Sequence, residues 1–340
     1  MPLEILSDLE SNELAGEWNQ FLEICSASRV PFLRYEYLST WWQTRGGGEW
    51  PEARLHTLLK RDEQGKLVGA APLFSAQNRD GVPALMLVGS IEISDYLDLM
   101  AAEPDLPALV ETLLDHLASG EAPEWQALDL YNLPDDSPTL AVLQAAAERR
   151  GWRYEQEQLQ SCPYIPLPGD WDAYLAGIDK KQRHEIRRKM RRAEEAQPPA
   201  TWYIAEDGDR LDAEMDDFMA LMAMDPEKER FLTPEMRKQM KLSARAAFDA
   251  GWLQLAFMVA GGQKAAGYLN FDYAGHIWVY NSGLNFNFRE LSPGWVLLGN
   301  LLKWANENKR HAFDFMRGDE DYKYRFGGIN RYVVRALVRK

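Results

Sequence analysis

The stretch that decides the fold is WLQLAFMVAGGQKAAGYLNFDYAGHIWVY, residues 252–280. Apolar and aromatic residues dominate this stretch, and Gly261-Gly262 interrupts it where the chain can turn. A glycine turn between two apolar runs is typical of a β-hairpin. The run from His276 to Tyr280 then predicts a further strand. The stretch therefore predicts a small sheet built from consecutive strands.

A helix start comes next, in the segment Leu291-Ser-Pro-Gly-Trp295. Ser292 is a favoured capping residue, proline suits the first helical turn, and Gly294 lets a ligand approach the backbone closely. The predicted helix 295–308 would point its free N–H groups and the positive end of its dipole at this spot. Such a site favours a phosphate or pyrophosphate. The alternative is an ordinary capped helix without a ligand.

A short predicted strand then leads into a polar and aromatic segment, 317–327. Within it, Lys323 could stabilise a developing oxyanion or hold a phosphate. Tyr322 or Tyr324 could protonate a leaving thiolate. Asp314, inside the strand, could orient an amine or bond to a neighbouring strand. The alternative for the whole segment is a solvated connection with aromatic residues in the core.

The length and composition limit the classes of protein to which the chain can belong. The chain has 340 residues, of which 46% are apolar, so it can bury a full core in two domains of ordinary size. The formal net charge is −14, which argues against nucleic acid as the main partner because affinity for a phosphate backbone depends on clustered cations.

The cysteines, the histidines and the apolar runs give few further indications of function. The two cysteines lie far apart and the five histidines show no ligand spacing, so neither a disulfide framework nor a metal site is expected. The first residues lack a signal-peptide pattern, and no apolar run approaches the roughly 20 residues of a membrane span. A cytoplasmic protein is therefore expected.

The two halves of the chain echo each other. A hairpin around Gly65 resembles the hairpin around Gly262, and in each half a helix precedes a strand that carries an aspartate, Asp129 or Asp314. The order is the same in both halves. This pattern predicts an internal duplication, with one domain at 1–165 and a second at 166–340.

Taken together, residues 174–327 resemble the acyltransferase domain of the GNAT superfamily. The resemblance is narrower to the CelD-like or BioF-associated acetyltransferases, which are related to Fem-like peptidyltransferases. It rests on the hairpin, Tyr280-Asn-Ser-Gly-Leu-Asn285, the Ser-Pro-Gly helix start, Phe313-Asp-Phe315, Gly318 and Tyr322-Lys323. A weaker match covers the N-terminal half, at Pro31-Phe32, Trp41-Trp42, Gly69-Ala-Ala-Pro-Leu-Phe74 and Asp95-Tyr-Leu-Asp98.

The resemblance implies an α/β (α+β) fold of two tandem GNAT-like domains, each a mixed, mostly antiparallel sheet flanked by helices. It also implies transfer of an acyl group, in the first instance acetyl, from acyl-coenzyme A to an amine. The donor would bind beside a strand and a helix start, at Tyr280, Asn281, Ser282, Ser292, Gly294 and Trp295. In Fem-like relatives an aromatic-Lys pair near the end of the chain serves transfer, and Tyr322-Lys323 matches that pair.

One departure from the family pattern concerns the donor. The usual Arg/Gln-x-x-Gly-x-Gly/Ala loop is absent, and Arg289-Glu-Leu-Ser-Pro-Gly294 keeps only an arginine and one glycine. The sequence alone therefore leaves use of coenzyme A open.

A basic helix is predicted from Asp179, which would cap it, to about residue 196. Its cations are Lys180, Lys181, Arg183, Arg187, Arg188, Lys189, Arg191 and Arg192. One interpretation is a solvated helix that pairs with neighbouring acids. The other is recognition of an anionic acceptor, with Arg183 and Arg187 in contact with it, and with Asp95 and Tyr96 contributed by the N-terminal match.

Three functions are compatible with these observations. The leading hypothesis is an acyl-coenzyme A-dependent N-acyltransferase without a metal, acting on a small molecule, a sugar or an envelope precursor. The second is a Fem-like transferase that takes its donor from aminoacyl-tRNA. The third is a non-catalytic binding relative in an exopolysaccharide pathway. A monomer or a homodimer is expected.

Overall fold

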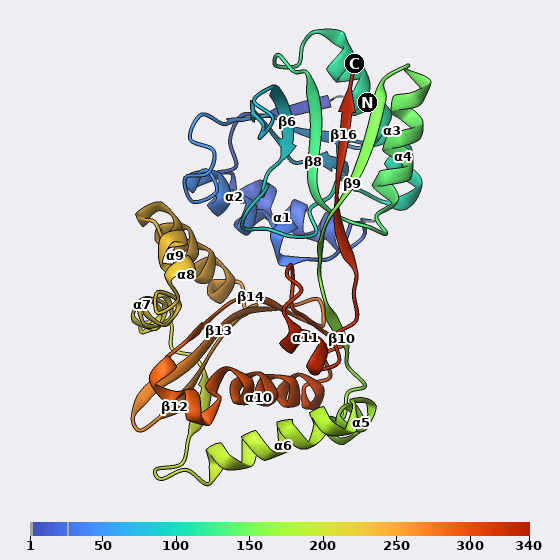
Figure 1. Cartoon of the computed structure of the whole chain (residues 1–340). Helices are drawn as coiled ribbons and strands as arrows, with labels where there is room; N and C mark the ends of the chain where they lie inside the picture. Colours follow the sequence, from blue (N-terminus) through green and yellow to red (C-terminus); the bar gives the residue numbers. More distant parts are fainter. Residues whose placement is uncertain (1–2, 26) are drawn as a thin grey trace. The chain divides into compact units, whose positions relative to one another are not determined.

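The computed structural model describes residues 3–25 and 27–340. The chain divides into two compact units, one of residues 1–160 with 332–340 and one of residues 161–331 (Figure 1). The break thus falls a few residues before the predicted boundary at 165, and the last nine residues leave the second unit. They do so because β16 (Tyr332–Arg339) pairs antiparallel with β8 (Ala127–Pro134).

The first unit holds two sheets. The four-stranded sheet has the order β1-β3-β4-β7 and the six-stranded sheet has the order β2-β5-β6-β8-β16-β9. Their other strands are β1 (Leu3–Leu6), β2 (Arg54–Leu55), β3 (Thr57–Arg61), β4 (Leu67–Ala71), β5 (Leu73–Gln77), β6 (Pro83–Leu87), β7 (Met100–Ala101) and β9 (Arg153–Ser161). The helices are α1 (Asn12–Leu22), α2 (Tyr35–Thr44), α3 (Leu106–Ser119) and α4 (Pro138–Arg149), with short 3-10 turns η1 (Pro31–Leu33) and η2 (Glu103–Asp105).

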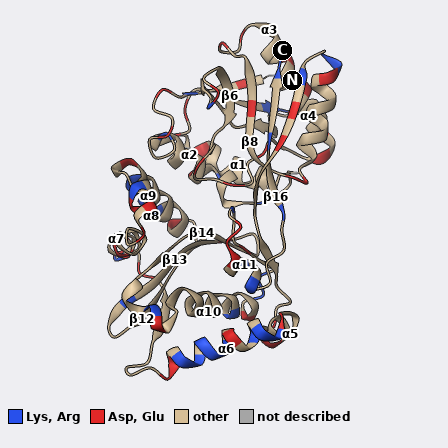
Figure 2. Cartoon of the chain, in the orientation of Figure 1, with Lys and Arg blue, Asp and Glu red and all other residues tan. Residues whose placement is uncertain are grey.

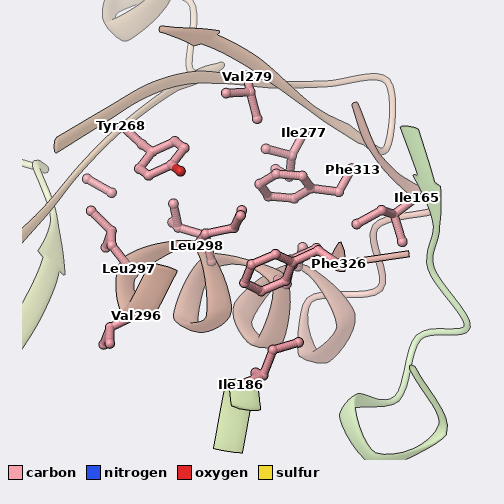
Figure 3. Close-up of a cluster of buried hydrophobic side chains, with 14 of the residues drawn as sticks. Ile165, Ile186, Tyr268, Ile277, Val279, Val296, Leu297, Leu298, Phe313 and Phe326 are labelled. Atoms are coloured by element: carbon pink, nitrogen blue, oxygen red, sulfur yellow. The ribbon is translucent and has the colours of Figure 1, made fainter. Parts of the chain in front are cut away.

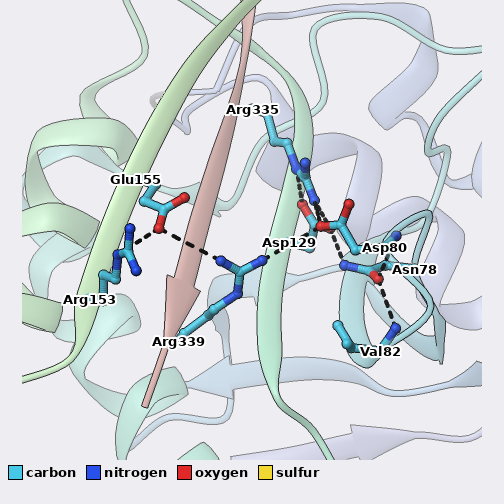
Figure 4. Close-up of polar contacts among 8 residues, drawn as sticks. All are labelled: Asn78, Asp80, Val82, Asp129, Arg153, Glu155, Arg335 and Arg339. Carbon is cyan, nitrogen blue, oxygen red and sulfur yellow. Dashed lines mark hydrogen bonds and ion pairs between the residues drawn. The ribbon is translucent and has the colours of Figure 1, made fainter.

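A buried ion pair holds the end of the chain in the first unit. The guanidinium of Arg335 on β16 makes two hydrogen bonds, each 2.7 Å, to the fully buried carboxylate of Asp129 on β8 (Figure 4). Arg335 also contacts Asp80 at 2.8 Å, and Asn78 donates to Asp129 at 2.7 Å. Each oxygen of the buried carboxylate therefore has a donor, which is the condition for burying a charge.

The second unit has one six-stranded sheet in the order β10-β15-β14-β13-β12-β11, in which β14 and β15 are parallel and the other pairs antiparallel. Its strands are β10 (Tyr164–Pro166), β11 (Thr201–Ile204), β12 (Leu253–Ala260), β13 (Gln263–Tyr273), β14 (His276–Leu284) and β15 (Ala312–Asp314). Its helices are α5 (Trp171–Gly177), α6 (Lys180–Glu194), α7 (Leu211–Met222), α8 (Pro226–Phe231), α9 (Pro234–Asp249), α10 (Pro293–Glu307) and α11 (Asp321–Arg325), with η3 (Phe286–Leu291) before α10.

Helices cover both faces of this sheet. A buried cluster lies between the sheet and α10; it includes Tyr268, Ile277 and Phe313 of the sheet, Leu298 of α10, and Phe326 (Figure 3). On the opposite face α7 approaches β14 so closely that a Cβ on Gly283 would lie 2.6 Å from the backbone nitrogen of Met222. The close approach explains the glycine there.

Several local predictions are confirmed. The hairpin of β12 and β13 and the strand β14 occupy 253–284, as the opening stretch predicts. Asp179 caps α6 by accepting hydrogen bonds from the backbone of Lys181 and Gln182, at 2.9 and 3.2 Å. The fold class is confirmed too, although the first unit distributes its strands over two sheets.

Candidate functional site

A β-bulge in β14 creates the candidate site. Leu269 pairs with Asn281 and Asn270 pairs with Val279, so Tyr280 is the extra residue on β14. The extra residue reverses the alternation of β14: Ile277 and Val279 face α10 before it, whereas Ser282 and Leu284 face that side after it. Bulges of this kind re-aim side chains next to active sites.

The bulge also marks where β14 loses its neighbour. β15 pairs with β14 only from His276 to Trp278, and within the described chain no strand lies on that edge beyond it. At Ser282, side chains instead of a neighbouring strand make the hydrogen bonds of the backbone N–H and C=O. Its N–H donates to Oδ1 of Asn281 at 2.8 Å, and its C=O accepts from Nζ of Lys228 at 2.5 Å.

An apolar cavity lies between this edge and α10, and we call it the inner cavity. It measures about 200 Å³. Its lining residues are Tyr268, Ser282, Leu284, Gly294, Trp295, Leu298, Tyr322 and Phe326. None of them carries a charge, so the cavity suits an uncharged, largely apolar group.

Hydrogen-bond donors project from these apolar walls. Burial raises the pKa of Tyr268, and it raises the pKa of Tyr322 well above its usual range; the carboxylate of Glu320 acts in the same direction on both. Both phenols therefore stay protonated across the neutral range. In addition, Nε1 of Trp295 is buried and has no hydrogen-bond partner among the described residues.

The start of α10 borders the inner cavity. Ser292 adopts a left-handed backbone with φ 51°, and its side chain makes no capping hydrogen bond, so the predicted cap is wrong. Within the described chain the N–H groups of Gly294 and Trp295 have no partner. Nζ of Lys189 on α6 lies 4.0 Å from the centre of the Trp295 ring. Free amides, the helix dipole and this ammonium together favour an anion here.

Lys and Arg residues recur along the basic helix α6 (Figure 2), and they contact different neighbours. Arg183 reaches the carbonyls of Leu175 and Ala176 at 3.4 Å, and Arg187 lies 3.2 Å from Asp172. Both arginines expected to bind the acceptor therefore contact α5, whereas Lys189 lies beside the start of α10.

A second, smaller cavity lies on the α7 side of β14, and we call it the outer cavity. It measures about 50 Å³. Its lining residues are Leu221, Met222, Asp225, Lys228, Ser282, Gly283, Leu284 and Phe286. Ser282 and Leu284 line both cavities, so both cavities border the unpaired edge of β14.

The structure gives Lys323 a different environment from the one predicted. Its ammonium is buried and donates to the carbonyls of Arg317 at 2.9 Å and Gly318 at 3.0 Å, with an ion pair to Glu320 at 2.9 Å. These contacts use all three N–H groups. Lys323 thereby holds the loop that precedes α11 and does not line either cavity.

Asp314 and Tyr324 are likewise engaged in the fold. Asp314 is fully buried, forms an ion pair with Arg331 and accepts from the backbone N–H of Met316 at 2.7 Å. Tyr324 donates to Oδ1 of Asn330 at 2.8 Å. Of the four residues expected to be catalytic, only Tyr322 lines the inner cavity.

The two residues expected from the N-terminal match lie inside the first unit. Tyr96 is fully buried with a left-handed backbone, φ 57°, and Asp95 is 5% exposed. Burial leaves Tyr96 no surface that an acceptor could reach, so we assign neither residue a role in binding.

Two charged residues of the site were not identified from the sequence. Lys228 lines the outer cavity, and the exposed carboxylate of Glu320 acts electrostatically on Tyr268, Tyr322 and Lys228. Glu320 lies just before the Tyr-Lys pair, so its proximity to that pair is visible in the sequence. Nothing local to Lys228 indicates that α8 packs against β14.

Comparison with known protein families gives the class of protein. Residues 180–324 match the family model Acetyltransf_6, described as an acetyltransferase (GNAT) domain. The matched segment includes α6, the hairpin, β14 and α10, and hence most of both cavities. Most of the second unit therefore matches a GNAT-type acetyltransferase domain, which agrees with the GNAT resemblance of the sequence and supports acyl transfer as the class of activity.

Three solved structures share the fold over the whole chain. FemX has a TM-score of 0.66 at 12% identity, covering 99% of this chain and 97% of its own. A conserved protein of unknown function from Bacteroides thetaiotaomicron VPI-5482 has a TM-score of 0.63 at 12% identity, covering 100% of both chains. L-PGS from Bacillus licheniformis has a TM-score of 0.59 at 11% identity, covering 99% of this chain and 94% of its own.

Identities this low show the fold alone. No curated protein matches the sequence. No helix in the described chain is both long and apolar enough to cross a bilayer. The described residues also contain no cluster of three or more side chains suited to bind a metal ion.

Proposed function

We propose that the protein transfers an acyl group from acyl-coenzyme A to an amine, and that it does so in the second unit. The observation that carries the proposal is the inner cavity, which opens along an unpaired strand edge and ends at a helix start with free N–H groups. An extended thioester with a phosphorylated end has the matching chemistry. The proposal includes the cytoplasmic location expected from the sequence.

The residues present fit such a donor. Its apolar arm would lie in the inner cavity against Leu284 and Leu298, where it removes apolar surface from water. Its pyrophosphate would accept hydrogen bonds from the amides of Gly294 and Trp295. Lys189, which lies beside the Trp295 ring and 3.5 Å from Glu185, would supply a cation. The amides of Gly294 and Trp295, together with Lys189, would thus take the place of the glycine loop that other family members use to bind the pyrophosphate.

The chemistry then requires a proton acceptor for the amine and support for the leaving sulfur. We assign the first role to Glu320, whose carboxylate pairs with Lys323 but is exposed and acts electrostatically on the cavity tyrosines. Asp314 is instead fully buried against Arg331 and lines neither cavity. We assign the second to Tyr322. Its raised pKa exceeds that of a thiol, about 8.5, so it stabilises the thiolate by a hydrogen bond and full proton transfer would be uphill.

A transfer assay tests the proposal. Purified protein would be incubated with acyl-coenzyme A species of increasing chain length and a panel of amines, sugars and envelope precursors. Release of free thiol and the acylated acceptor would be followed by mass spectrometry. Tyr322→Phe is expected to lower kcat about tenfold, the value of one hydrogen bond, and Tyr324→Phe serves as the matched control. No transfer from any donor would contradict the proposal.

The second candidate donor is an aminoacyl-tRNA, and the observation in its favour is the basic helix α6. Lys180, Lys181 and Arg191 form no ion pair within the described chain, so they remain available to phosphates. Binding of tRNA would weaken steeply with salt, by the counterions released at each phosphate contact. Binding of acyl-coenzyme A would depend on salt far less, which separates the two donors. Binding of neither would favour the non-catalytic alternative.

A further inference from the structure

Lys228 lies on the short helix α8, where its side chain turns toward the sheet. Asp225 caps that helix by accepting from the backbone of Glu227 at 2.8 Å and of Lys228 at 3.4 Å. The cap fixes the orientation of the first turn. The side chain of Lys228 then spans the outer cavity and reaches the edge of β14.

The ammonium of Lys228 is only partly satisfied. It donates to the backbone carbonyl of Ser282 at 2.5 Å, and among the described residues no carboxylate lies within ion-pair distance. An ammonium has three N–H groups, so two remain. Burial lowers the pKa of Lys228, while Asp225 and Glu320 act in the opposite direction. A half-buried cation with spare donors can serve a negative charge that forms beside it.

The position of this ammonium is specific. Among the residues that line the inner and outer cavities, Lys228 is the sole cation. Its hydrogen-bond partner, Ser282, belongs to both cavities, so the ammonium lies where a donor in the inner cavity would meet an acceptor from the outer one. Lys323, the lysine that the sequence suggested for this role, has its N–H groups bound to carbonyls and Glu320.

We propose that Lys228 is a catalytic residue that stabilises the thioester carbonyl oxygen as it becomes negative. This inference rests on the proposed acyl transfer. The amine nitrogen forms a bond to the carbonyl carbon, and the carbon–oxygen π electrons move to the oxygen beside Lys228. As those electrons return, the carbon–sulfur bond breaks and the sulfur leaves as a thiolate. The proton lost by the amine goes to Glu320, so charge and atoms balance.

Lys228→Met tests the role. The expected result is a fall in kcat of about 100-fold to 1,000-fold, the loss measured when one oxyanion donor is removed. The dissociation constant of acyl-coenzyme A, measured by calorimetry, should stay within about twofold, because the ammonium acts on the transition state. Lys238→Met is the control, since Lys238 is exposed on the neighbouring helix α9, and its kcat should not change.

A chemical rescue distinguishes charge from structure. Lys228→Cys can be alkylated with 2-bromoethylamine, which rebuilds an ammonium at nearly the original length, while Cys25 and Cys162 are buried. Recovery of kcat after alkylation is expected and would show that the variant was folded. A kcat within about threefold of wild type for Lys228→Met, or no recovery of a folded Cys variant, would overturn the role. Wild-type protein that transfers no acyl group would overturn the proposed function itself.

Discussion

The two units are built from the same strand–helix–strand element and use it differently. In the first unit β6, α3 and β8 form this element, and β6 pairs in parallel with β8 from Ala84 opposite Ala127. In the second unit β14, α10 and β15 do the same, starting from His276 opposite Ala312. The internal duplication predicted from the sequence is consistent with this shared topology.

The units differ in the segment after the first strand of the element. β6 ends at Leu87, and the segment 88–98 then folds onto the end of β8, where Asn132 donates to the carbonyls of Ile91 at 2.9 Å and Ser94 at 2.8 Å. In contrast, β14 continues through its bulge to Leu284 and leaves the inner cavity open. The same topology is therefore closed by its own chain in one unit and open to a ligand in the other.

The helix starts differ in charge as well. α3 is preceded by Glu103 and Asp105, which repel an anion. The start of α10 instead offers free amides beside Lys189. The shared strand–helix–strand element can therefore keep its fold without an open cavity, because the fold depends on strand pairing and the inner cavity depends on the bulge in β14 and the side chains around it.

The largest expected effect concerns the equivalent aspartates, Asp129 and Asp314, which both pair with arginines near the end of the chain. Arg335→Met leaves the carboxylate of Asp129 buried without its main partner, so we expect a loss of about 3–5 kcal/mol in the free energy of unfolding. Arg331→Met should cost less, because the side chain of Arg331 is 27% exposed and that of Arg335 only 12%. Urea unfolding measures both. Equal losses would contradict the difference between the two pairs.

The next effect concerns the open cavity itself. A Cβ on Gly294 would lie 2.7 Å from Cδ2 of Leu284, so Gly294→Val fills the inner cavity with side chain. We expect kcat/KM to fall about 100-fold, the scale of a misplaced substrate, with little change in the melting temperature. Ala108→Val, in the first turn of α3, is the matched control and should leave kcat/KM unchanged. A similar loss of kcat/KM in Ala108→Val would contradict the difference between the two helix starts.

A third effect is confined to the first unit and depends on pH. Nε2 of His56 lies 2.9 Å from Nε2 of His116, and burial, together with His116, lowers the pKa of His56 to about 4. An unfolded histidine has a pKa near about 6.5, so between these values the unfolded chain binds more protons than the folded one. The resulting stability is complete above about pH 6.5 and is lost as the pH falls toward about 4.

Urea midpoints at about pH 7.5 and about pH 5 measure this loss. His56→Gln should reduce the dependence on pH, whereas His184→Gln, on the surface of α6, should leave it unchanged. An unchanged dependence in His56→Gln would remove the His pair as its source.

The smallest effect tests the anion site at α10. Lys189→Met should raise the KM for acyl-coenzyme A about threefold to fivefold, the value of one partly exposed charge contact, and leave kcat unchanged. Arg188→Met, at the preceding position and paired with Glu185 at 2.8 Å, is the control. The difference between the two should shrink as salt is added. A larger effect from Arg188 would place the phosphates elsewhere.

Much of the fold could be predicted because its signals are local. Glycine turns and capping residues such as Asp179 mark element ends within a few positions, and the structure confirms the Asp179 cap. The bulge at Tyr280 could not be predicted, since a bulge depends on the register with β13 rather than on the residue itself. It reverses which side chains of β14 face α10, so a strict alternation misassigns the cavity wall.

The candidate site was only partly visible for the same reason. Tyr322, Gly294 and Trp295 were identified from sequence next to a recognisable helix start or motif, and all three line the inner cavity. Lys228 comes from a helix more than fifty residues before the strand edge it contacts. The return of residues 332–340 to the first unit is a pairing of the same long-range kind. Such contacts leave no mark in a local pattern.

The central claim is that an acyl donor binds only to the second unit. Counting the donor molecules bound to each chain tests this claim. Native mass spectrometry would count the molecules of a non-hydrolysable acyl-coenzyme A analogue bound to each chain, and hydrogen exchange would locate them. We expect one molecule per chain, with slower exchange at 279–298 and no change at 84–98. Two molecules per chain, or protection at 84–98, would contradict a site confined to the second unit.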